Sequence, residues 1–178
     1  MTKTNDFIWK GLQIITWIIF AGFCVQTGAL LFNYIYSLFR PIATHNLHLG
    51  LNLSAIYDRS IWLYTCLFSF ILVLSAMKAW IFYLVIRIFK KLNLVKPFSP
   101  EIANQIGRIS QYALGIGIIS AIAHEFTKRL IHKGYDVNNI ESYWNDSDAY
   151  LMMAAVLFVI TLLFQKGIEL QTENDLTV

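Results

Sequence analysis

The sequence predicts an all-α, polytopic membrane protein with four transmembrane helices and with both termini in the cytoplasm. Of the 178 residues, 57% are hydrophobic and only 14% are charged, whereas about a quarter of the residues in an average soluble domain are charged. The chain also contains apolar runs that reach the roughly 20 residues a helix needs to cross a bilayer. The membrane class is therefore favoured over a soluble helical bundle.

We expect a single membrane domain over residues 1–178. The predicted spans cover residues 11–39, 60–89, 109–126 and 147–164, which leaves a cytoplasmic loop at residues 90–108 and a short polar cytoplasmic tail at residues 165–178. The first apolar run continues to Phe39 and is too long for the apolar region of a signal peptide. We therefore expect it to remain uncleaved as the first span.

The orientation follows from the Lys and Arg residues near the span ends, because cytoplasmic loops are enriched in both. With the N-terminus inside, the inner side carries Lys3, Lys10, Arg87, Lys90, Lys91, Lys96, Arg108 and Lys166, and the outer side carries Arg40, Arg59, Lys128, Arg129 and Lys133. The remaining cation, Lys78, lies within the second span. We expect it near the inner boundary, where its ammonium group reaches the lipid headgroups.

The loop at residues 90–108 contains the start of a helix. Ser99 suits the N-cap, Pro100 the first helical position and Glu101 the positive end of the helix dipole. The helix is thus expected to begin before the third span. Within that span Ala113, Gly117 and Ala121 recur at helical spacing, which is typical of a close-packed face between membrane helices.

The first outer loop has a period-two pattern. Its leucines alternate with other residues, as Leu47, Leu49, Leu51 and Leu53. Such alternation is typical of an extended, half-buried segment. We expect this segment to pair with the second outer loop as a small cap.

The sequence shows no pattern of catalytic residues, and we expect neither an enzyme nor a bound cofactor. The pair His124-Glu125 lacks the second histidine of the zinc-protease motif, because Lys128 occupies its place. An outer metal site remains an alternative, since histidine and carboxylate are both metal ligands. Its candidate ligands are His45, His48, His124, His132, Asp136, Glu141, Asp146 and Asp148, whose spacing is not specific.

Two polar segments resemble a known family. Residues 164–171 (FQKGIELQ) and 173–178 (ENDLTV) resemble the closing signature of a bacterial membrane family catalogued as domain of unknown function 2975, and residues 96–101 (KPFSPE) are similar to its loop. The resemblance extends to the four spans, the loop position and the tail. The family has no established biochemical activity, and its members are often encoded beside a small helix-turn-helix regulator of the Cro type. The resemblance therefore implies a protein of the bacterial cytoplasmic (inner) membrane, in signalling, that senses a signal or anchors such a regulator.

The same two segments are the candidates for partner binding. They comprise Pro97, Phe98, Ser99, Pro100 and Glu101 in the loop, and Gly167, Glu169, Gln171, Glu173 and Asp175 in the tail. Opposite charges would either dock the acidic tail on the basic loop or form one joint surface, and a merely solvated tail is the alternative. Nothing in the chain has the pattern of a nucleic-acid reader, so contact with DNA is expected only through the partner. A small transporter or a toxin-immunity membrane protein is the alternative function.

Overall fold

The computed structural model describes residues 3–92, 98–135, 137 and 140–176. Over these residues every regular element is a helix and no β-strand forms, which confirms the all-α class. The long helices are α1 (Lys3–Phe39), α3 (Ile61–Lys91), α4 (Pro100–His132) and α5 (Ser147–Leu176). They are joined by the short helix α2 (Ser54–Arg59) and by the 3-10 turns η1 (Pro41–His45), η2 (His48–Gly50) and η3 (Ile140–Tyr143).

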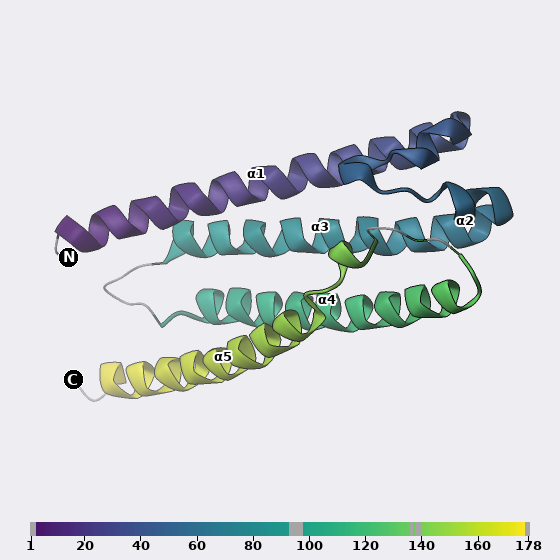
Figure 1. Ribbon diagram of the computed structural model, residues 1–178. Coiled ribbons are helices and arrows are strands. Elements are labelled where there is room, and N and C mark those ends of the chain that lie inside the picture. The colour runs from purple at the N-terminus through teal and green to yellow at the C-terminus, as the bar shows by residue number, and fades with distance from the viewer. Residues whose placement is uncertain (1–2, 93–97, 136, 138–139, 177–178) are drawn as a thin grey trace.

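Four helical segments are long and apolar enough to cross a membrane, and each overlaps one predicted span. Both described ends of the chain lie at the same end of the molecule as the end of α3 and the start of α4 (Figure 1). We call this the tail end, and we call the opposite end, with η1, α2 and the start of α3, the cap end. The placement of the tail end in the cytoplasm stays a prediction.

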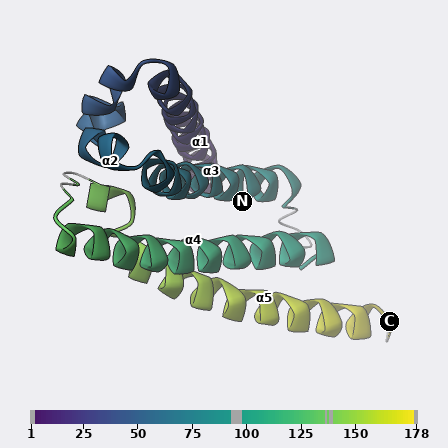
Figure 2. The same cartoon turned by 90° about the vertical axis from the view of Figure 1, so that its right-hand side faces the viewer.

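The long helices form an open row in the order α1, α3, α4, α5 (Figures 1 and 2). Packing joins neighbours in this order, α1 with α3, α3 with α4 and α4 with α5. The most apolar stretches of the edge helices α1 and α5 are each only 11% buried, against 39% for α3 and for α4. Apolar faces exposed over this length are incompatible with a monomeric soluble protein and suit contact with lipid.

The start of α4 agrees with the sequence. The Ser99 hydroxyl accepts a hydrogen bond from the backbone N–H of Ile102 at 3.3 Å, and Pro100 occupies the first turn. This local chemistry satisfies one of the free N–H groups at the helix start. The prediction that the helix begins ahead of the third span is confirmed.

The predicted polar tail is instead part of a helix. After residue 164, α5 continues without a break to Leu176, which makes it about 45 Å long at 1.5 Å per residue. Lys166 forms an ion pair with Glu169 one turn along, and the Thr172 hydroxyl donates to the Ile168 carbonyl. Gly167 lies within the helix and does not end it. The end of the span at residue 164 stays a prediction, because the loss of hydrophobicity there marks a change of environment and not the end of a helix.

The predicted small-residue face of α4 packs at two of its three positions. Ala113 and Gly117 are buried, whereas Ala121 is exposed. A Cβ atom at Gly117 would lie 2.7 Å from the Leu151 side chain of α5. The absence of that atom lets α4 and α5 approach closely, as small residues do between membrane helices.

The cap end has a core of its own. There α1, α3 and α4 extend beyond the start of α5, and the connecting segments fold back against them (Figure 1). Buried apolar side chains of this region include Leu47, Leu51, Leu53, Ile56, Tyr64, Phe68, Ile140 and Trp144. The Tyr143 hydroxyl donates to the His48 carbonyl at 3.2 Å. The expectation that the two outer loops meet is confirmed.

The extended segment expected in the first of these loops is wrong. Residues His48–Gly50 form a 3-10 turn in which Leu49 has a φ of 60° and its side chain is 75% exposed. Leu47, Leu51 and Leu53 are buried on either side of that turn. A strand would have placed all four leucines on one face, but Leu49 and Gly50 both have a left-handed φ, of 60° and 74°, and turn the chain there.

Candidate functional site

Phe98 joins the two segments that are candidates for partner binding. Its ring meets the ring of Phe164 edge-on, with centroids 5.2 Å apart. It also covers Gly167, where an added Cβ atom would lie 2.6 Å from Cδ1 of Phe98. Since Phe98 remains 40% exposed, the loop and the end of α5 form one continuous surface at the tail end.

This contact is aromatic, whereas the sequence suggested pairing of opposite charges as one way in which the two segments could meet. Glu101 forms an ion pair with Lys91, at the two ends of the same connection, and Glu169 pairs with Lys166 within α5. Neither carboxylate joins the loop to α5. Because these charges are satisfied locally, burial of the Phe98 ring against the backbone of α5 is the observed link between the segments.

The other candidate residues continue this surface. Ser99 and Pro100 begin α4 beside Phe98, and Pro100 is exposed. Along α5, Glu169 and Glu173 are exposed and Gln171 is half-buried. Pro97 lies outside the described residues. Asp175 belongs to the described backbone of α5, and its side chain lies outside the description.

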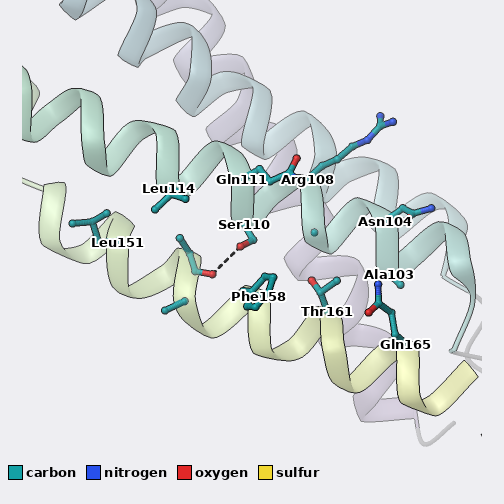
Figure 3. Close-up of a pocket in the computed structure, with 13 residues that line it drawn as sticks. Ala103, Asn104, Arg108, Ser110, Gln111, Leu114, Leu151, Phe158, Thr161 and Gln165 are labelled. Atoms are coloured by element: carbon teal, nitrogen blue, oxygen red, sulfur yellow. Dashed lines mark hydrogen bonds between the residues drawn. The ribbon is translucent and has the colours of Figure 1, made fainter.

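A groove between α4 and α5 adjoins this surface. It has a volume of about 780 Å³ and is lined by Asn104, Gln111, Thr161, Gln165 and apolar neighbours such as Phe158 (Figure 3). The Ser110 hydroxyl donates to the Ala154 carbonyl at 2.8 Å, which ties the two helices together along the groove. Polar side chains at this density on a membrane helix are typical of a face that contacts water or a ligand.

Sequence analysis did not identify this groove. Its lining comes from two spans, and the hydrogen bond that ties them joins residues 44 apart in sequence. The available signal was the polar series Asn104, Arg108 and Gln111, which repeats at the spacing of one helical face. The predicted boundary at residue 109 divided that series, with Asn104 and Arg108 in the cytoplasmic loop and Gln111 in the third span.

Lys78 lies elsewhere than expected. Its ammonium group is 3.6 Å from the Asp146 carboxylate and 5.3 Å from the centre of the Tyr150 ring, and its side chain is only 14% exposed. Asp146 directly precedes α5, so Lys78 faces the start of α5 and not the tail end. Lys78 was expected nearer the tail end because the sequence does not specify where α5 begins relative to α3. In the structure α5 begins beside Lys78.

The alternative of a metal site gains no support within the described residues. No three His, Cys, Asp or Glu side chains gather there in a way that could hold a metal ion. One of the proposed ligands, Asp136, lies outside that part of the chain. His132 instead makes a hydrogen bond through Nδ1 with the Lys128 carbonyl at 2.8 Å.

The structure therefore assembles one exposed surface from Phe98, Gly167 and their neighbours, next to a polar groove. The resemblance of these segments to a bacterial membrane family stays a prediction. Comparison of the chain with known protein families, with curated proteins and with solved structures finds no match.

Proposed function

We propose that the chain is a non-enzymatic, multi-pass protein of the bacterial inner membrane that acts in regulation. In this proposal the tail end faces the cytoplasm and anchors a helix-turn-helix regulator. The observation that carries it is the contact of Phe98 with Gly167, which unites the two segments of family resemblance in one surface. An exposed aromatic ring at the centre of such a surface is the kind of anchor that protein interfaces use.

The arrangement also supports a role in signalling. Helices α3 and α4 run from the cap end, with its separate core, to the tail end (Figure 1). Rigid helices of this kind can transmit a small displacement between two ends of a protein. A signal received at the cap end would in this way alter the position of Phe98 relative to α5.

The test is co-purification with a regulator. The proposal predicts a helix-turn-helix gene beside the gene for this chain, whose product is retained by the full chain in detergent. Deletion of residues 167–178 should abolish retention, and Phe98→Ala should weaken it. Gly28→Ala serves as the matched control, since a Cβ atom there would meet no described atom within 4 Å beyond the local backbone of α1. Retention that survives the deletion would disprove the role of the tail.

A small transporter, or a toxin-immunity protein, is the second candidate. It is favoured by the pair of Lys78 and Asp146, because charged residues within membrane helices mark transport paths. Hollows of about 170 and 320 Å³ adjoin Lys78 on its two sides. This candidate predicts that Lys78→Met alters uptake of a solute, or sensitivity to an extracellular toxin, while the regulator still co-purifies.

A further inference from the structure

Another hollow, separate from those beside Lys78, lies between α3 and α4 at the tail end. Its volume is about 340 Å³, and its lining consists of Arg87, Glu101, Asn104, Gln105 and Arg108. Arg108 stands on the ridge between this hollow and the α4–α5 groove, and its side chain extends away from α5 (Figure 3). The hollow thus lies beside the surface around Phe98 and shares only Glu101 with its candidate residues.

The hollow carries an excess of positive charge. Among the described residues, neither Arg87 nor Arg108 has an ion pair, and the one acid of the lining, Glu101, is paired with Lys91. Two guanidinium groups that lack carboxylate partners favour an anion. Arginine binds the oxygens of phosphate groups in a bidentate manner, which makes a phosphate the best match.

Gln105 adds a requirement for a hydrogen-bond donor. It lines the hollow, is only 4% exposed, and its Oε1 atom has no hydrogen-bond partner within the described part of the chain. A buried acceptor without a donor is unfavourable. A phosphodiester oxygen cannot donate, but a hydroxyl group can. The ligand that satisfies the whole lining therefore combines a phosphate with a neighbouring hydroxyl.

The surroundings of the hollow supply an apolar track. One helical turn from Arg108 lies Tyr112, and two turns from Arg87 lies Trp80, which is 45% exposed. The centroids of these two rings are 6.3 Å apart, so they form one surface that extends from the hollow toward the middle of the helices. A ligand with an anionic head and a hydrocarbon chain matches both parts.

We propose that this hollow binds the headgroup of an anionic phospholipid that carries a free hydroxyl, as phosphatidylglycerol does. The phosphate faces Arg87 and Arg108, the hydroxyl donates to Gln105, and an acyl chain lies along Tyr112 and Trp80. Basic pockets between membrane helices on the cytoplasmic side are known to hold anionic headgroups. This site depends on the four helices crossing a membrane and is independent of any regulator.

The test is native mass spectrometry of the full chain in neutral detergent, titrated with single lipids. Phosphatidylglycerol should bind more tightly than phosphatidylcholine. Arg87→Gln and Arg108→Gln should each weaken it roughly fivefold, from about 1 kcal/mol per basic residue near the headgroups. Arg129→Gln, near the opposite end of α4, is the matched control and should leave the affinity unchanged.

Gln105→Met separately tests the proposed hydrogen bond from the lipid hydroxyl to the Gln105 side chain. It should lower the affinity for phosphatidylglycerol to that for phosphatidylmethanol, a phosphodiester lipid whose headgroup has no hydroxyl, and leave the latter unchanged. If this buried variant fails to fold, Arg108→Gln at an exposed side chain still decides the proposal. Equal affinity for phosphatidylcholine, or no effect of the arginine variants, would overturn the site. Full competition by inorganic phosphate would show a site for soluble anions and contradict a lipid ligand.

Discussion

Gly167 allows the ring of Phe98 to lie directly on the backbone of α5. Gly167→Ala places a Cβ atom 2.6 to 2.9 Å from three ring carbons, so the ring must move. Overpacking of this kind costs about 1–3 kcal/mol. We predict a lower thermal unfolding temperature in detergent and faster proteolysis of the loop before α4.

The control for this substitution is available on α1. An added Cβ at Gly28 would meet no described atom within 4 Å beyond the local helix backbone, so Gly28→Ala should leave stability unchanged or raise it by up to ~1 kcal/mol through helix propensity. Equal effects of the two substitutions would contradict a specific contact between Phe98 and Gly167.

Between α1 and α3, hydroxyl groups link the helices. The hydroxyls of Thr27 and Ser75 are 2.8 Å apart, whereas the Thr16 hydroxyl donates only to Leu12 of its own helix. We predict that a double-mutant cycle of Thr27→Val and Ser75→Ala yields a coupling free energy of about 0.6 kcal/mol, as is typical of membrane helices. The same cycle with Thr16→Val should give none. Chemical unfolding in mixed micelles measures both, and coupling in the control cycle would contradict the assignment.

The cap end is predicted to fold around its own apolar core. Leu53 is completely buried and Leu49 is 75% exposed, although the two lie four residues apart in the same loop. Leu53→Ala should therefore destabilise the cap by about 2–5 kcal/mol, and Leu49→Ala should change its stability little. Hydrogen exchange of the amides of residues 44–57 measures the difference. Similar protection in both variants would show that the cap lacks a packed core.

At the scale of elements, the sequence revealed those features that depend on local chemistry. Ser99 and Pro100 define the start of α4 through contacts within one turn, and this start was predicted correctly. The helical continuation of α5 beyond residue 164 was not predicted, because a helix can continue from lipid into water and hydrophobicity reports only the environment. The turn at Leu49 was missed because a left-handed φ at leucine is unusual and alternation of leucines favours a strand.

At the scale of the whole molecule, the number of long apolar helices was predictable and their arrangement was not. Length and composition identify each candidate span. The open row, the start of α5 opposite Lys78, and the groove between α4 and α5 all arise from contacts between residues distant in sequence. The candidate site was predicted as two segments, but their junction through Phe98 depends on the path of α5, which no local pattern specifies.

The central claim is that the loop before α4 and the end of α5 form one cytoplasmic surface of a four-span protein. The most direct test is cysteine labelling in intact bacteria, in a chain with Cys24 and Cys66 replaced by alanine. A membrane-impermeant maleimide should label Glu101→Cys and Glu169→Cys only after permeabilisation, and should label Glu141→Cys at the cap end in intact cells. Labelling of the first two positions in intact cells, or on opposite sides of the membrane, would contradict the account.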